Sequence, residues 1–380
     1  MKAVILSCNT GGGHNAAAHA LQQAFALRGH QAAVLDYLTL ASRNVSKTVG
    51  NSYVRMVQHT PVAFGAVYDL GMAVSRHVKR SPVYYANAAM AKHLREYLQA
   101  NPVDVILATH LFAAETLTWM KRHGDPLPPT IAVATDYTCI PFWEETDCDA
   151  FISPHAELVA KYVARGIPAE KLYALGIPVS PSFLTPMAKA EARAALGLAA
   201  DKPYYLLVGG SMGAGDLGRL TSNLVKLTQS STAELIVVCG SNAQMQRKLT
   251  ARFRRVARVQ VQGRTEQMRC LMAACDILYI KPGGLTSTEA AAARIPLVHT
   301  EPIPGCETEN RSFFTSHGMS VSGDTTLAQA RAGVALMKDP AACQAMRDAQ
   351  AHCLLSDSAL RICALAEQLA SQRSREAGEP

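Results

Sequence analysis

The sequence predicts an α/β fold with two doubly wound units in series, each built on a parallel sheet with crossover helices. The chain has 380 residues, which is enough for two domains. Hydrophobic residues make up 49% and charged residues 18%, so the disordered and fibrous classes are excluded. Short apolar runs rich in β-branched residues alternate with amphipathic runs along the chain, which is typical of parallel sheets.

Eleven apolar runs are predicted to be strands. In the first half they are Ala3–Ser7, Ala32–Leu35, Val103–Ala108, Thr130–Ala134, Ala150–Ser153 and Tyr173–Leu175, and in the second half Tyr204–Val208, Glu234–Cys239, Val259–Gln262, Asp276–Ile280 and Ile295–His299. Prolines at 178, 181 and 186 predict a linker, since proline disfavours helix before it. We therefore expect domains over 1–180 and 181–356. A last helix is expected from about Asp357 to Gln372, within a terminal segment 357–380.

The ten cysteines indicate reduced thiols and no metal site. They are sparse over this length, and none shows the spacing of a zinc site. Asp147-Cys148-Asp149 matches a three-residue pattern that holds a divalent ion in some enzymes, but such short patterns recur by chance, and we expect a surface turn there. No stretch is long and apolar enough to predict a membrane span or a signal peptide.

A glycine-rich turn with a histidine follows the first predicted strand. Gly11, Gly12 and Gly13 allow close approach of the backbone to a ligand and leave the next helix open to an anion. The spacing is neither the dinucleotide fingerprint nor a P-loop. His14 lies in the first helical turn, at the sheet edge where such folds bind ligands, and its ordinary pKa suits a general base. Asp136, after a later strand, is a second candidate base or an orienting residue; its ordinary role would be a helix or turn cap.

Two more glycine-rich segments follow strands of the second half. The first, from Gly209 to Gly215, again opens into a helix. In the second, Gly283 and Gly284 leave a helix start open to an anion, while Thr286 or Ser287 can cap it. Glu289 either stabilises that helix start or accepts hydrogen bonds from the hydroxyl groups of a ribose. Equivalent loops in two α/β units predict a ligand cleft between their carboxyl edges.

A serine hydrolase is the rival interpretation from another enzyme class. Gly209-Gly210-Ser211-Met212-Gly213 also satisfies Gly-x-Ser-x-Gly, the nucleophile elbow of α/β hydrolases. Ser211 would be the nucleophile, and the candidate bases downstream are His299, His317 and His352. This interpretation leaves the first half of the chain without a role.

Taken together, these motifs resemble those of the diacylglycerol glycosyltransferases. The resemblance rests on the glycine-histidine turn, Thr135-Asp136-Tyr137, the Gly209 to Gly213 loop, the Pro-Gly-Gly-Leu-Thr-x-x-Glu run, and Pro304-Gly305-x-Glu307-x-Glu309-Asn310 with Phe313-Phe314. It covers the chain nearly end to end. The family comprises the monogalactosyldiacylglycerol synthases and the processive diacylglycerol glucosyltransferases, and the peptidoglycan GlcNAc transferase is more loosely similar.

The resemblance implies a GT-B architecture and an inverting transfer of a hexose from a UDP-sugar to a diacylglycerol-type lipid without a required metal. It implies that the final helix crosses back to the first domain. His14 matches the family's catalytic histidine. The residues implied to bind the donor are Gly12, Gly13, Gly209, Gly210, Ser211, Met212, Gly213, Arg264, Thr265, Gly283, Gly284, Leu285, Thr286, Glu289, Glu307 and Asn310. Cys306 stands where the family commonly has Gln, so a side-chain contact to the sugar is in doubt there. The alternatives left open are a polyprenyl-linked peptidoglycan precursor as acceptor and a UDP-sugar epimerase.

The positive charge of the chain is concentrated in one segment. Residues 43–95 hold eight bases (Arg43, Lys47, Arg55, Arg76, Lys79, Arg80, Lys92 and Arg95) against one acid, Asp69. With the apolar residues Val62, Phe64, Val67, Tyr68, Leu70 and Met72, this segment could lie on an anionic membrane surface. We therefore expect a cytoplasmic protein attached to the inner leaflet and no nucleic-acid partner. An amphipathic helix packed on the first domain is an equally good interpretation of this segment.

Overall fold

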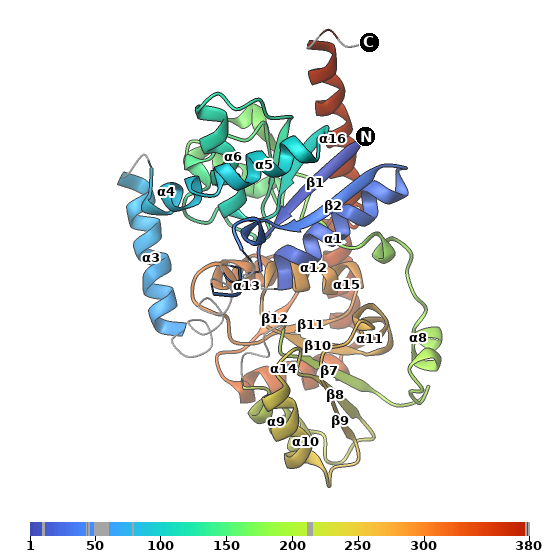
Figure 1. The fold of residues 1–380 in the computed structure, drawn as a ribbon. Coiled ribbons are helices and arrows are strands. Elements are labelled where there is room, and N and C mark those ends of the chain that lie inside the picture. The colour runs from blue at the N-terminus through green and yellow to red at the C-terminus, as the bar shows by residue number, and fades with distance from the viewer. Residues whose placement is uncertain are drawn as a thin grey trace. The chain divides into compact units, whose positions relative to one another are not determined.

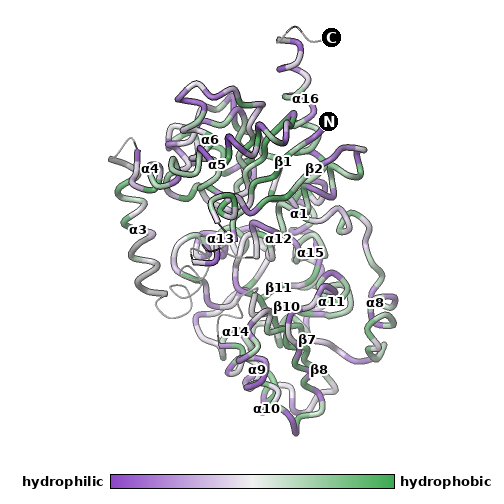
Figure 2. Tube along the Cα trace, in the orientation of Figure 1, coloured by the Kyte–Doolittle hydropathy of each residue, from purple (hydrophilic) through white to green (hydrophobic). Residues whose placement is uncertain are grey.

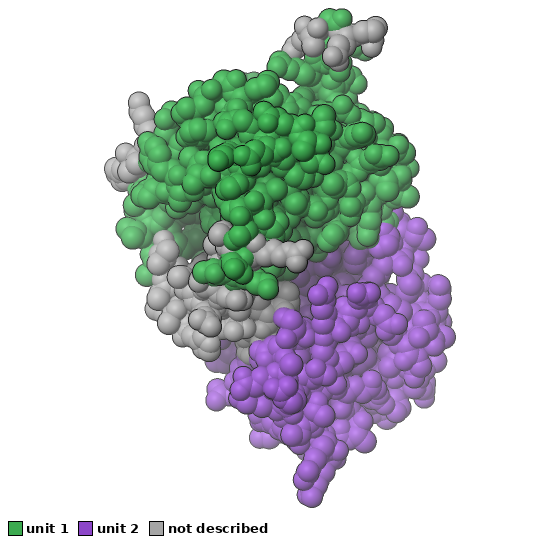
Figure 3. Space-filling view, viewed as in Figure 1, with its two compact units in different colours: residues 1–181, 304–306, 355–380 green, residues 182–303, 307–354 purple. Residues whose placement is uncertain are grey.

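The computed structural model describes residues 1–9, 12–42, 44, 46–48, 61–77, 80–210, 216–376 and 378 (Figure 1). The chain divides into two compact units, which Figure 3 colours separately. Unit 1 comprises Met1–Pro181, Pro304–Cys306 and Leu355–Pro380, and unit 2 comprises Ser182–Ile303 and Glu307–Leu354. Each unit contains one six-stranded sheet in which every described pair of strands is parallel, so the predicted α/β class is confirmed.

Unit 1 is built on a sheet of order β2-β1-β3-β4-β5-β6. Its strands are β1 (Lys2–Ser7), β2 (Gln31–Asp36), β3 (Val105–Ala108), β4 (Thr130–Val133), β5 (Ala150–Ile152) and β6 (Leu172–Tyr173). Its α-helices are α1 (Gly12–Leu27), α3 (Pro61–His77), α4 (Pro82–Ala88), α5 (Ala91–Ala100), α6 (Leu111–Arg122), α7 (Val159–Ala164) and α16 (Ser358–Glu376). The central strands β1 and β3 are buried along almost their whole length, as expected of strands covered on both faces.

The last helix, α16, belongs to the core of unit 1. Ile362, Cys363 and Ala366 are fully buried and pack in one cluster with Leu21 and Phe25 of α1 and with the apolar face of the sheet. At its start, the Ser358 hydroxyl donates a hydrogen bond of 2.8 Å to the carbonyl of Gly176. The C-terminal segment therefore returns to the first unit, as the family resemblance implies.

Unit 2 repeats the architecture with the order β12-β11-β10-β7-β8-β9. Its strands are β7 (Tyr204–Val208), β8 (Glu234–Val238), β9 (Val259–Gln262), β10 (Ile277–Ile280), β11 (Leu297–His299) and β12 (Val321–Ser322). Its α-helices are α8 (Lys189–Ala195), α9 (Leu217–Leu227), α10 (Ala243–Phe253), α11 (Met268–Ala274), α12 (Gly284–Ala292), α13 (Cys306–Ser316), α14 (Thr326–Lys338) and α15 (Pro340–Cys353). The apolar strands of the sheet stand out in the hydropathy colouring of Figure 2.

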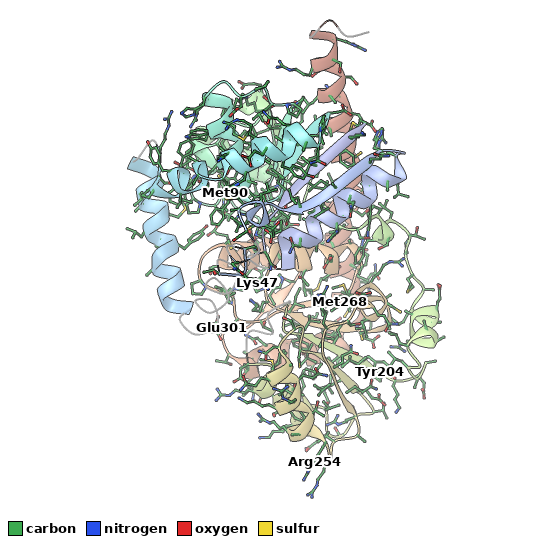
Figure 4. The ribbon with its side chains drawn as sticks, in the orientation of Figure 1. Lys47, Met90, Tyr204, Arg254, Met268 and Glu301 are labelled. Atoms are coloured by element: carbon green, nitrogen blue, oxygen red, sulfur yellow. The ribbon has the colours of Figure 1, made fainter. Side chains whose placement is uncertain are left out.

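Close packing fixes the two central strands of unit 2. Tyr204, labelled in Figure 4, opens β7; its hydroxyl accepts a 2.9 Å hydrogen bond from the N–H of Ala199. On β10, the Tyr279 hydroxyl donates to the carbonyl of Ala330 in α14 at 3.2 Å. A Cβ atom at Gly333 would lie 1.9 Å from that hydroxyl, so only glycine allows α14 to approach β10 this closely.

The predicted strands are all present, with differences at their ends. Residues 295 and 296 were expected in a strand, but β11 begins at Leu297, because Pro296 has no N–H to donate to a sheet. The two-residue strand β12 was not predicted, since so short a run carries no alternation. The last helix extends beyond the expected Gln372 through a polar stretch.

Neither a membrane-spanning helix nor a disulfide is found. Across the described residues, no helix combines the length and the apolar character needed to cross a bilayer. All ten cysteines lie in the described part of the chain, and no disulfide joins any of them.

We predict that Glu367→Gln loosens the docking of α16. Glu367 accepts hydrogen bonds of 2.6 Å from both Arg28 Nε and Nη2 and one of 2.7 Å from His30, and these contacts lower the pKa of Glu367 to about 2. The pairs are partly exposed, so the free energy of unfolding should fall by about 1 kcal/mol at pH 7. Because the folded pKa is depressed, this difference should shrink as the pH falls from about 4.5 towards 2. Chemical denaturation of both proteins, with exposed Glu170→Gln as control, measures it; an equal loss at all pH values would contradict the role of the ion pairs.

Candidate active site

The topology of each sheet indicates where a ligand binds. In unit 1, β1 lies between β2 and β3, so the chain reverses its direction of winding between β1 and β3. In unit 2 the equivalent reversal lies between β7 and β10. Ligands of doubly wound folds bind at such switch points, outside the carboxyl ends of the strands. The predicted loops follow these strands: His14 follows β1, while Gly209 and Gly283 follow β7 and β10.

His14 is held in one tautomer by its surroundings. It is the third residue of α1, and its Nδ1 lies 2.8 Å from the carbonyl oxygen of Thr109, directly after β3. A carbonyl only accepts, so Nδ1 carries the proton; the Thr135 hydroxyl lies 3.2 Å from the same nitrogen. In the neutral ring Nε2 is therefore unprotonated, which is the form that a general base requires.

Two more groups act on His14 from neighbouring strand ends. The ring of His110 meets that of His14 edge to face, with centroids 4.5 Å apart. His110 caps α6 by accepting a 3.2 Å hydrogen bond from the N–H of Phe112, and burial keeps its pKa well below the ordinary value. Burial also lowers the pKa of His14, whereas the charge of Asp136 raises it. Asp136 lies in a bend after β4 and no helix begins there, so the helix-cap part of that interpretation is wrong, while the turn-cap part stays a prediction.

In unit 2, the start of α12 lacks a side-chain cap. Gly283 is the N-cap residue, and among the described residues no side-chain cap hydrogen bond is found at this helix start. Our expectation that Thr286 or Ser287 caps this helix is wrong, because the helix already begins at Gly284. Ser287 instead bonds to His299 at 2.9 Å. The open N–H groups and the helix dipole favour an anion at this end.

Glu289 presents a carboxyl group for which the described part of the chain offers no hydrogen-bond or ion-pair partner. It is the sixth residue of α12, beyond the first turn, where the helix dipole would stabilise it little. No hydrogen bond or ion pair reaches its side chain from the described residues. Burial raises the pKa of Glu289 to about 7. An acceptor that is half-buried and lacks a partner fits a bound ligand better than a role in helix stability.

Glu307 and Asn310 occupy two different environments on α13. The Glu307 carboxylate pairs with the Lys281 ammonium at 3.1 Å and accepts a 2.7 Å hydrogen bond from the N–H of Ile303. Asn310 is fully buried and donates a 2.9 Å hydrogen bond to the carbonyl of Pro282. Asn310 therefore supports the loop before α12 from within. Lys281 was not among the predicted site residues, because its pairing partner is 26 positions away in sequence.

The other predicted donor residues lie in loops of the same unit. Gly210 has a φ of 67°, a conformation that favours glycine, and the N–H of Gly209 donates to Val238 at 3.0 Å. Arg264 and Thr265 lie between β9 and α11; Arg264 is exposed, and the Thr265 hydroxyl accepts from Gln267 N–H at 3.0 Å. Gly12 and Gly13 open α1, whereas Leu285 and Thr286 lie in the first turn of α12. Ser211, Met212 and Gly213 lie outside the described residues.

Two of the alternatives from the sequence can be compared with the structure. His299, a candidate base for a hydrolase, is fully buried between the hydroxyls of Ser287 and Ser320, and burial lowers its pKa to about 3. It is a structural histidine. Asp147 pairs with Lys171 at 2.6 Å and Asp149 with Lys121 at 2.8 Å, so both carboxylates of the Asp-x-Asp pattern have protein cations as partners.

The basic segment is described in part. Arg43, Arg55 and Lys79 lie outside the described residues, as do the side chains of Val62, Phe64, Val67 and Arg76. On α3, Gly71 lies against Phe142, Met72 Sδ lies 3.2 Å from Arg165 Nη1, and Leu70 is 63% exposed. The helix thus packs on unit 1 with one face and presents an apolar residue on another.

Comparison with known proteins supports the family resemblance. A family model described as monogalactosyldiacylglycerol (MGDG) synthase matches residues 14–179. A processive diacylglycerol beta-glucosyltransferase of Staphylococcus saprophyticus is 28% identical over 74% of this chain and 71% of its own length. A probable monogalactosyldiacylglycerol synthase 2 of Oryza sativa subsp. indica is 29% identical over 84% of this chain and 70% of its own length. Among solved structures, MurG of Acinetobacter baumannii is similar with a TM-score of 0.61 and 16% identity over 97% of this chain and 99% of MurG.

The chain has the GT-B architecture, and the class of protein that it resembles in fold and in sequence is the glycosyltransferases. Within that class the chain is a relative of the monogalactosyldiacylglycerol synthases and the processive diacylglycerol glucosyltransferases, as its motifs predict. The same fold is seen in a UDP-GlcNAc 2-epimerase of Neisseria meningitidis, with a TM-score of 0.64 at 12% identity over 97% of this chain and all of that one.

We predict that Asp136→Asn shifts the pH dependence of catalysis. The charge of Asp136 raises the pKa of His14, so its removal should lower that pKa further and move the acid limb of kcat/KM to lower pH. Rates between about pH 5 and 8 measure the shift. His14→Ala should instead lower kcat by roughly 10² to 10⁴ at every pH. If Asp136→Asn causes that loss and His14→Ala does not, Asp136 is the base.

We predict that Glu289→Gln stabilises the ligand-free protein. Because the folded pKa is raised, the folded carboxyl keeps a proton between about pH 4.5 and 7 that the unfolded chain has lost, so stability falls as the pH rises through this range. A neutral amide avoids this loss. The Tm of the variant should exceed that of the wild type by a few degrees above pH 7 and match it near pH 4.5. Calorimetry without ligand tests this; a lower Tm above pH 7 would mean that the carboxylate is structural.

Proposed function

We propose that the protein transfers a hexose from a UDP-sugar to the hydroxyl group of a diacylglycerol-type membrane lipid, with inversion at the anomeric carbon. The main support for the donor is Glu289, whose carboxyl is half-buried, has no partner among the described residues, and lies on the helix whose start has no side-chain cap. The names of the relatives support the acceptor half.

In the proposed donor site, unit 2 binds the nucleotide. The open N–H groups of α12 and the loop at Gly209 and Gly210 meet the diphosphate, because backbone donors at a helix start favour anions. Glu289 accepts hydrogen bonds from the ribose hydroxyls, and the 264–265 loop meets the uracil. The ionised carboxylate is a stronger acceptor than the protonated carboxyl, so donor binding should weaken as the pH falls below about 7.

In the proposed reaction, His14 acts as general base. Its unprotonated Nε2 takes the proton of the acceptor hydroxyl while the oxygen attacks the anomeric carbon. The bond from this carbon to UDP breaks on the opposite face, and both its electrons leave with the diphosphate. Preorganised N–H groups stabilise that charge without reorganisation. We therefore propose that no divalent metal is required.

The acceptor is proposed to lie in a membrane that the protein meets peripherally. The exposed Leu70 on α3 and Tyr85 on α4, which is 59% exposed, could enter the interface while Arg80 and Lys47 meet anionic headgroups. Each cation near an anionic surface contributes about 1 kcal/mol. The inner leaflet of the cell membrane is the proposed location.

UDP release from a panel of UDP-sugars, with and without anionic vesicles that contain diacylglycerol, tests the proposal. We expect release from one sugar that depends on the lipid and persists in EDTA. His14→Ala should lose turnover but keep UDP binding, whereas Glu289→Ala should lose both turnover and UDP binding. The control is Glu170→Ala at an exposed position, which should keep both.

Three outcomes would contradict parts of this proposal. UDP binding without lipid-dependent release would point to another acceptor, such as a polyprenyl-linked precursor, or to epimerisation. Loss of activity in EDTA would contradict the metal-free mechanism. Equal binding to neutral and anionic vesicles would contradict the role of the basic residues at the membrane.

A further inference from the structure

An ion pair between Lys281 and Glu307 lies at the switch point of unit 2. Lys281 follows β10 and Gly209 follows β7, and these strands are neighbours with Ile280 opposite Val208. A Cβ atom built on Gly210 would lie 3.8 Å from Lys281 Cε, so the lysine side chain passes beside this glycine loop. Its Nζ lies 3.1 Å from Glu307 Oε1. The ammonium thus lies among the loops that follow both central strands.

The position of this lysine is electrostatically unfavourable for a purely structural residue. Lys281 precedes the uncapped start of α12 by three positions, and a helix N-terminus repels cations. The Lys281 and Glu307 side chains are only 11% and 13% exposed, and such pairs yield little net stability because both charges lose their water. A lysine beside an open helix start and a glycine loop makes sense if an anion binds there.

Glu307 is arranged to hold the ammonium in place. Its second carboxylate oxygen, Oε2, accepts the 2.7 Å hydrogen bond from Ile303 N–H, so the carboxylate is fixed while Oε1 faces Lys281. Oε1 also lies 3.9 Å from a Cβ atom built on Gly283, the N-cap of α12. A fixed carboxylate this close to the helix start would repel a diphosphate, which argues against direct contact between Glu307 and the phosphates.

We infer that Lys281 is a catalytic residue that binds the diphosphate of the donor nucleotide and stabilises it as leaving group, and that Glu307 is the positioning residue that orients the ammonium. This inference rests on the proposed function. When the bond between the anomeric carbon and the diphosphate oxygen breaks, both electrons go to that oxygen, and the positive charge of Lys281 stabilises the growing negative charge. The lysine keeps its proton throughout.

Binding of UDP and of uridine to wild type and Lys281→Met tests the role of the lysine. Methionine keeps the unbranched side chain but removes the charge. UDP should bind about tenfold to a hundredfold more weakly, because a hydrogen bond to a charged group is lost. Uridine, which has no phosphate, should bind equally to both proteins. Lys281→Arg should restore part of the UDP affinity, and exposed Lys338→Met on α14 is the control.

Glu307→Gln separates this inference from a structural role of the pair. The amide can still accept from Ile303 N–H but no longer neutralises Lys281 or holds it by charge. UDP should therefore bind a few times more tightly, uridine should be unaffected, and kcat should fall because the ammonium is no longer oriented. A merely structural pair would instead weaken UDP and uridine alike in both variants. Equal weakening of UDP and uridine binding, or unchanged UDP binding by Lys281→Met, would overturn the inference about Lys281. The proposed function would not be affected by either result. If the wild type binds no UDP, the proposed function fails, and the inference fails with it.

Discussion

The parallel direction of all described strand pairs is the constraint on which both candidate sites depend. In a parallel sheet every strand ends at the same edge, so loops far apart in sequence meet there. In unit 1 this edge collects His14 after β1, Thr109 and His110 after β3, and Asp136 after β4. In unit 2 it collects the loops after β7 and β10. The order of strands therefore decides which motifs can act together.

The two edges differ in their electrostatic character. At the edge of unit 1, burial keeps two imidazoles neutral, and a carbonyl oxygen selects the tautomer of His14 that can accept a proton. The edge of unit 2 has an uncapped helix start, a glycine in the left-handed conformation and a buried ammonium, all of which suit an anion. This contrast agrees with a reaction in which one unit removes a proton and the other receives a diphosphate.

Much of the fold could be predicted from local patterns, whereas pairings between distant residues could not. The runs that form β1 and β7 predict buried strands because nearly every residue in them is apolar. The glycines after them predict the loops that follow. The cap of α12 was misassigned because the sequence does not reveal that the helix begins at Gly284, before Thr286 and Ser287. The tautomer of His14 depends on Thr109, 95 positions away, and this contact requires the order of the strands. The pairing of Lys281 with Glu307 likewise requires the loop before α13 to fold back.

No sequence pattern predicts the packing of Pro304–Cys306 on α3. Pro304–Cys306 belong by their contacts to unit 1, although the residues on both sides belong to unit 2. A Cβ atom at Gly305, where φ is 108°, would lie 3.0 Å from the Tyr68 ring on α3. The segment just before Glu307 therefore packs on the helix that carries the exposed Leu70, and glycine is required there by both backbone conformation and space.

Hydrogen exchange with and without UDP tests the central claim, that the nucleotide binds at the carboxyl edge of the unit 2 sheet. We expect slower exchange at Gly210 and in the first turn of α12, because UDP occupies their open N–H groups, and little change around His14. Protection confined to the loops of unit 1, or none in α12 at saturating UDP, would contradict it.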